Sequence, residues 1–137
     1  MATSINGKGI MAMGSMPEMC TCDDVVQNLY CLSVTAHKEH ENAVLSKSYS
    51  KHVALGEFYD KVSDFKDRVV EYMIGQDYIK EVSLEEIDSD EDIMDEANEA
   101  VSSLQMYSRL KGDDALINMS GDLKEMVGKL KYMLKFA

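Results

Sequence analysis

The fold is decided by residues 50–75, which read SKHVALGEFYDKVSDFKDRVVEYMIG. Apolar side chains recur there in steps of three and four residues, at Leu55, Phe58, Val62, Phe65, Val69 and Tyr72 or Met73. This spacing places them on one stripe of an α-helix, and Gly75 is typical of a helix end. An apolar stripe of this length needs other helices to cover it, so the sequence predicts a helix within a bundle.

Three further helices are predicted, over about residues 22–45, 90–110 and 120–135. Each has the same helical spacing of apolar residues. Thr21 is a typical cap for the first of them. The residues 112–114, Gly-Asp-Asp, are expected to end the third helix, and Asn118 or Ser120 is expected to cap the fourth. The fold class is therefore all-α, a four-helix bundle.

The predicted connections are short, long and short in chain order. The long one, about residues 76–90, is expected to cross the end of the bundle, and one long crossover between two short joints is the ferritin-like arrangement. Residues 1–19 are rich in Met, Gly and Ser without a sustained period and are expected to form a flexible arm. The predicted organisation is this arm followed by a ferritin-like bundle over residues 20–137.

Composition excludes several classes of function. The 137 residues carry 25 Asp and Glu against 14 Lys and Arg, a net charge of −11. A chain with this negative charge is not expected to bind nucleic acid or an anionic membrane. No apolar run approaches 18 residues and the start does not resemble a signal peptide, so a cytoplasmic protein with free thiols at its three cysteines is expected.

Residues 46–52, SKSYSKH, and residues 54–60, ALGEFYD, resemble a group of small ferritin-like proteins, many of them phage-encoded. More remotely, they resemble the Dps mini-ferritins, in which a histidine of the first helix precedes a similar Glu-x-x-Asp pattern. The resemblance implies an oligomeric bundle in the bacterial host cytoplasm or in the virion. It also implies a di-iron centre, but only where the ligands are retained.

The ligand positions are retained in part. The resemblance assigns Asp60 to the aspartate of the Dps pattern and His52 to the histidine of the phage group, and Glu71 stands in for a later acidic ligand. Three other positions of the pattern hold residues without a ligand atom, namely Ala43, Gly56 and Gly75. The resemblance therefore implies a degraded iron centre.

Two clusters on the predicted helices could still bind metal. Four acidic residues share one helix face opposite the apolar stripe, namely Asp60, Asp64, Asp67 and Glu71. Such a face is either solvated and paired with neighbouring Lys and Arg, or meets a second subunit, where mini-ferritins build their metal site. His37, His40 and Glu41 lie within one helical turn; His40 falls on the apolar stripe, where a buried histidine without metal is the alternative.

The arm and the long connection are the predicted partner-binding segments. In the arm these residues are Met11, Met13, Met16 and Met19, which could hold Cu(I) together with Cys20 and Cys22 or could dock on another protein. In the connection they are Asp88, Asp90, Glu91 and Asp92. With Glu99, the three aspartates match a calcium-loop template that requires glycine where Ile93 stands; acidic decoration of a helix N-terminus is the alternative.

The negative charge is concentrated in one part of the sequence, which is expected to lie at one end of the bundle. Residues 77–99 hold 11 acidic residues and one base, Lys80, whereas the rest of the chain has a net charge of −1. We expect a non-catalytic oligomeric or protein-interaction component that needs no cofactor and whose acidic segment faces solvent, a basic partner or cations. The alternative is a mini-ferritin that oxidises and stores iron between subunits.

Overall fold

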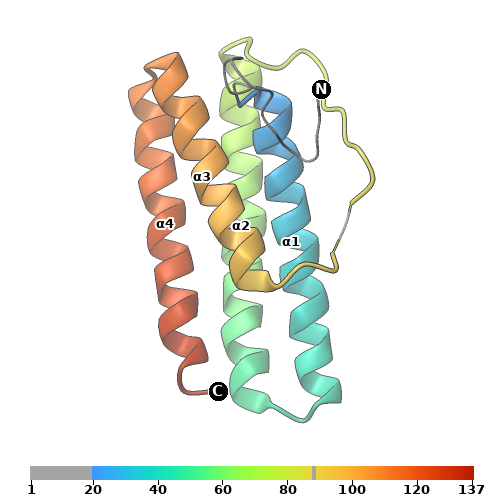
Figure 1. Cartoon of the computed structure of the whole chain (residues 1–137). Helices are drawn as coiled ribbons and strands as arrows, with labels where there is room; N and C mark the ends of the chain where they lie inside the picture. Colours follow the sequence, from blue (N-terminus) through green and yellow to red (C-terminus); the bar gives the residue numbers. More distant parts are fainter. Residues whose placement is uncertain (1–19, 88) are drawn as a thin grey trace, which may run out of the picture.

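The structure, a computed structural model, describes residues 20–87 and 89–137. Its helices are α1 (Cys22–Leu45), α2 (Tyr49–Gly75), α3 (Ile93–Lys111) and α4 (Asp114–Leu134), and the described residues contain no strand (Figure 1). The predicted all-α bundle is therefore confirmed.

Local interactions fix where α1 and α2 begin and end. The Thr21 hydroxyl accepts a hydrogen bond from the Asp24 N–H, and the Asp24 carboxylate accepts one from the Thr21 N–H, which is a capping box. Lys47, with a φ of 62°, lies in the three-residue turn that joins α1 to α2. The predicted extents of these two helices agree with the structure to within one residue.

The predicted start of α4 is wrong. Gly112, with a φ of 62°, ends α3, and the Asp113 carboxylate accepts hydrogen bonds from the N–H groups of Ala115 and Leu116. Asp113 is therefore the N-cap, and α4 starts several residues before Asn118 and Ser120. The left-handed glycine ends one helix and the aspartate directly after it caps the next, so only these two residues separate α3 from α4.

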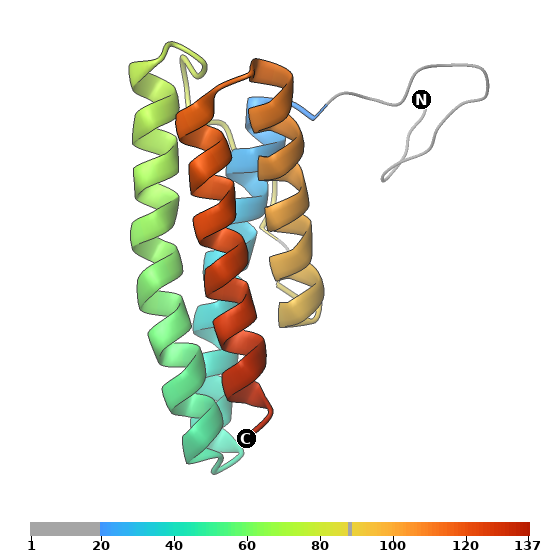
Figure 2. The same ribbon diagram turned by 90° about the vertical axis from the view of Figure 1, so that its left-hand side faces the viewer.

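The four helices form a square bundle with a long connection on its outside. α1 packs against α2 and α3, and α4 packs against the same two helices, so α1 and α4 are diagonal to each other. α2 and α3 run in the same direction, and residues 76–87 and 89–92 lie along the outer side of α1, so the prediction that this acidic connection lies at one end of the bundle is wrong (Figures 1 and 2). The Gln27 side chain holds this connection by donating to the Glu86 carbonyl and accepting from the Glu85 N–H.

The core lies between the four helices. The apolar stripe of α2 is buried as predicted, with Phe58 and Phe65 each 4 % exposed and Val62 fully buried. Leu29 of α1 and Leu123 of α4 are also fully buried. Burial of one such side chain contributes about 1.5–3 kcal/mol to folding. No helix of the described residues is long and apolar enough to span a bilayer.

Candidate functional site

His40 of α1 and His52 of α2 are in direct contact. Their rings stack with centroids 3.9 Å apart and an angle of 18° between the planes. Each Nδ1 bonds to the backbone carbonyl of the other histidine, at 2.9 Å for His40 and 3.1 Å for His52. Because a carbonyl only accepts, both Nδ1 atoms carry a proton, and in the neutral rings both Nε2 atoms are left as acceptors.

Gly56 makes room for this pair. A Cβ atom at position 56 would lie 2.7 Å from Cε1 and 2.9 Å from Nδ1 of His40, which is closer than van der Waals contact allows. The His40 ring therefore occupies the space next to α2 that a side chain at position 56 would need. The inward orientation of His40 therefore depends on the absence of a side chain at position 56.

The other members of the predicted α1 cluster do not join the histidine pair. His37 is exposed and stacks on Tyr59 of α2, with centroids 4.3 Å apart. Glu41 is exposed. His37, His40, Glu41 and His52 all border one open hollow near the α1–α2 turn, but in the described residues they do not form a group with ligand atoms close enough to share an ion.

The acidic face of α2 is exposed, as predicted for Asp60, Asp64, Asp67 and Glu71. The neighbouring bases are mostly engaged elsewhere: Lys61 pairs with Glu57 at 3.4 Å and Arg68 with Asp122 at 3.1 Å. Lys66 lies 4.4 Å above the Tyr30 ring and 3.8 Å from Asp67. In the described part of the chain, Asp60, Asp64 and Glu71 thus make no ion pair, and they face outward.

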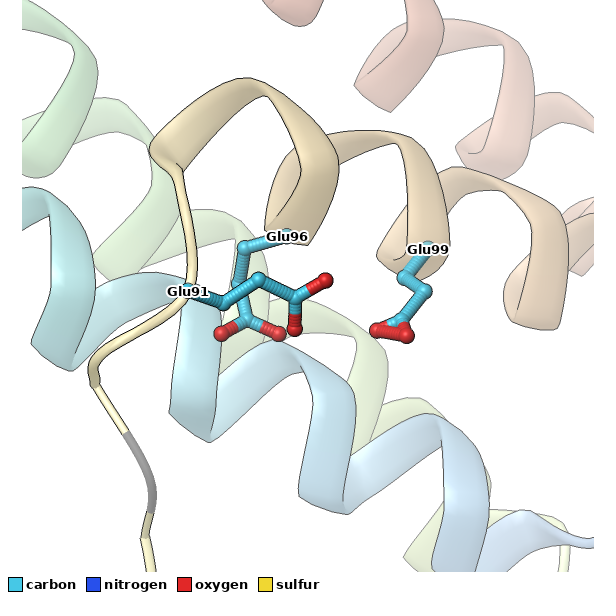
Figure 3. Close-up of side chains that lie close together, drawn as sticks. All are labelled: Glu91, Glu96 and Glu99. Carbon is cyan, nitrogen blue, oxygen red and sulfur yellow. The ribbon is translucent and has the colours of Figure 1, made fainter. Parts of the chain in front are cut away.

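The possible metal ligands predicted from the sequence include His40, His52, Asp60, Asp64 and Glu71. Of these five, the structure brings together only His40 and His52. Across residues 20–87 and 89–137, the only group of three or more potential ligands within 4.8 Å of one another is Glu91, Glu96 and Glu99 (Figure 3). Glu91 immediately precedes the N-cap of α3, and Glu96 and Glu99 project from its first two turns. Carboxylate oxygens of this kind suit hard cations such as Ca²⁺.

Glu96 is the residue that sequence reasoning missed. It is 3 % exposed, and glutamate is rarely buried to this degree. The signal was present, because Glu96 lies on the apolar stripe formed by Ile93, Ala97 and Ala100. A carboxylate on such a stripe either enters the core or has a specific function.

The calcium-loop template does not describe this segment. α3 starts at Ile93, so the template positions from Ile93 to Glu99 are helical. The Asp92 carboxylate caps this helix by accepting hydrogen bonds from the N–H groups of Met94 and Asp95. Acidic decoration of a helix start, with Asp90 and Glu91 exposed beside it, is what the structure shows.

At the other end of the bundle, Asp113 links three elements. Its carboxylate accepts hydrogen bonds from Tyr78, at 2.7 Å, and from Tyr72, at 2.9 Å. Burial raises the pKa of Asp113, but these hydrogen bonds and those from the backbone outweigh it and lower the pKa. The bond to Asp113, aided by burial, raises the pKa of Tyr78 to about 12. This cluster stabilises the end of the bundle.

The three cysteines are free thiols. Cys31 is buried, and Cys20 and Cys22 donate to the backbone carbonyls of Ser103 and Tyr78. Burial, together with the charge of Asp24, raises the pKa of Cys20 to about 11. A thiol with such a pKa is protonated at neutral pH and is a weak nucleophile.

Five of the predicted partner-binding residues lie outside the described residues, namely Met11, Met13, Met16, Met19 and Asp88.

Residues 44–134 match the model of a protein family described as a family of unknown function (DUF5856). The chain belongs to this family. No curated protein and no solved structure matches the chain at a significant level.

The DUF5856 segment includes the last two residues of α1, the long connection and all of α2, α3 and α4. It therefore contains His52, Gly56 and the Glu91, Glu96 and Glu99 group. His40, which fills the space beside Gly56, precedes the matched segment.

Proposed function

We propose that this DUF5856 protein is a non-catalytic ferritin-like bundle that acts as an oligomeric structural or protein-interaction component. The parallel direction of α2 and α3, with the connection between them lying along α1, supports the ferritin-like assignment (Figure 1). The sequence resemblance of residues 46–60 is the basis for the further proposal that the protein is phage-encoded and works in the bacterial host cytoplasm or in the virion.

The observation that carries the non-catalytic assignment is the packing of His40 against Gly56. A ferroxidase centre needs several ligands directed at one point. Here the space beside position 56 is filled by a histidine whose Nδ1 is bonded to the His52 carbonyl. The acidic residues of α2 that the resemblance assigns as ligands, Asp60 and Glu71, are exposed on the surface.

A mini-ferritin with a site between subunits is the second candidate, and one observation favours it. Metal-binding histidines commonly donate one ring N–H to a carbonyl, which fixes the tautomer and leaves the other nitrogen for the metal. His40 and His52 both have this hydrogen bond. Asp60, Asp64 and Glu71 of a facing subunit would supply the carboxylates, and iron would be the substrate.

Two measurements on the full chain distinguish the candidates. Light scattering gives the number of subunits, and the absorbance of ferric product after addition of Fe(II) and oxygen gives the rate of iron oxidation. We expect an oligomer that oxidises Fe(II) no faster than a His52→Ala/Asp60→Ala variant. A 12-subunit shell that mineralises iron, with iron binding tighter than about 100 µM that the double variant loses, would establish the mini-ferritin instead.

A further inference from the structure

One end of the bundle is basic. We define the basic end as residues 44–53 and 129–137, which hold the α1–α2 turn and the last turns of α4 and lie at the same end of the molecule (Figures 1 and 2). These residues contain no Asp or Glu and five lysines, namely Lys47, Lys51, Lys129, Lys131 and Lys135. Lys129 pairs with Glu57 at 2.8 Å. The other four lysines are exposed and make no ion pair with a described residue.

The basic end also exposes apolar side chains. Of the 13 large hydrophobic residues that are exposed in the described chain, six belong to it: Val44, Leu45, Tyr49, Val53, Tyr132 and Phe136. Leu45 and Tyr49 are each 79 % exposed, and Phe136 is 70 % exposed. Single exposed apolar residues are normal, but a concentration of them among lysines is typical of a surface that another molecule covers.

The opposite charge lies on the connection along the outside of α1 and on the first two turns of α3 (Figure 1). We define the acidic strip as residues 77–99. Nine of its 11 acidic residues are exposed; of the remaining two, Glu96 is buried and Asp88 is outside the described residues. Gln27 and Lys38 of α1 hold the connection in place by donating to the carbonyls of Glu86 and Ser89.

The two charged regions do not neutralise each other within one chain. α4, which carries three of the five lysines of the basic end, is diagonal to α1, along which the connection part of the acidic strip lies; the rest of the strip is the first two turns of α3, which packs against α4. None of the four ion pairs in the described residues joins the basic end to the strip. Complementary charges that cannot meet within a molecule can meet between two copies of it, where they would steer and orient the contact.

We propose that the basic end of one copy docks on the acidic strip of a second copy; this rests on the oligomeric function proposed above. The apolar side chains of the basic end supply the buried contact, and the lysines around them face the carboxylates of the strip. A two-fold contact between two basic ends is disfavoured because it would place like charges together. The proposed contact joins two different surfaces, so it builds a ring or a linear assembly.

Light scattering of the full chain at about 20 mM and about 500 mM NaCl tests the contact, because salt screens surface charges. We expect an assembly at low salt whose association constant falls at high salt. Lys51→Glu/Lys131→Glu should weaken association by about tenfold or more, whereas the control Lys124→Glu, on an exposed part of α4 outside the basic end, should not. An unchanged melting temperature shows that each variant is folded.

A charge swap identifies the second surface. Glu81→Lys/Glu85→Lys should weaken association in the same way, and mixing this variant with Lys51→Glu/Lys131→Glu should restore assembly. An assembly that is insensitive to both reversals would overturn the proposed contact and leave the oligomeric function standing. A wild-type monomer at every salt concentration would overturn both proposals. A monomer whose basic end binds anionic phospholipid vesicles or DNA would replace the contact between copies with that partner.

Discussion

The packing of His40 on Gly56 predicts a specific failure of additivity between two substitutions. Gly56→Ala replaces glycine by the best helix former inside α2, which by itself should stabilise the protein by about 0.5–1 kcal/mol. The added Cβ, however, would lie 2.7 Å from Cε1 of His40, so the His40 ring must move.

The cost of moving the ring follows from its contacts. His40 would lose the hydrogen bond from Nδ1 to the His52 carbonyl, worth about 0.5–1.5 kcal/mol, and the stack on the His52 ring, worth about the same. Gly56→Ala in the wild type should therefore leave stability unchanged or lower it by up to about 2.5 kcal/mol. In a His40→Ala background the obstacle is gone, and the helix gain should appear in full. The expected coupling between the two positions is about 1–3 kcal/mol.

Urea denaturation followed by far-UV circular dichroism, on the wild type, both single variants and the double variant, measures this coupling. Gly128→Ala is the matched control, because a Cβ at position 128 of α4 meets nothing within 4 Å. The control should gain about 0.5–1 kcal/mol in either background. Coupling between positions 40 and 56 of less than about 0.5 kcal/mol would refute the stated packing.

Four further substitutions test other parts of the structure by denaturation. Leu123→Ala, at a fully buried position, should lower the free energy of unfolding by about 2–5 kcal/mol. Thr35→Val should raise it by about 1 kcal/mol, because the Thr35 hydroxyl is buried without a hydrogen-bond partner among the described residues. Asp113→Ala removes the cap of α4 and should cost at least about 1 kcal/mol at neutral pH; the difference should shrink in acid, because a folded-state pKa below the ordinary value gives stability that is lost as the pH falls through it. Tyr78→Phe should reduce the loss of stability that the wild type shows as the pH rises from about 10 to about 12. In this range the unfolded chain releases the proton of the Tyr78 hydroxyl, whereas the folded chain keeps it, so rising pH favours unfolding.

The sequence was sufficient to predict which residues form the core, but not where helices begin and end next to acidic residues. The stripe of α2 is long and regular, so its period identified Phe58, Val62 and Phe65 as buried. In contrast, Asp113 follows a glycine, and a Gly-Asp pair is compatible with a loop as well as with two helices that meet. The hydrogen bonds from Ala115 and Leu116 to the Asp113 carboxylate decide between them, and they exist only in the folded chain.

The candidate site depended on contacts between helices, which spacing along one helix does not encode. The ring of His40 could be placed on the inner side of α1, but its stack on His52 depends on the register of α1 against α2. Likewise, Lys61 and Arg68 lie near the acidic face in sequence but pair with Glu57 and with Asp122 of α4. The burial of Glu96, in contrast, could have been predicted from the sequence, because this carboxylate lies on the apolar stripe of its helix.

The two faces of α2 explain why the proposed loss of iron chemistry would leave the fold intact. The inner stripe, which includes Val62 and Val69, is buried against the other helices and contributes to folding. The acidic residues Asp60 and Glu71 are exposed and make no ion pair in the described chain. Substitution on an exposed face usually changes stability by less than about 0.5 kcal/mol, so folding places no constraint on these ligand positions. Only function, either iron binding or contact with another subunit, can maintain them.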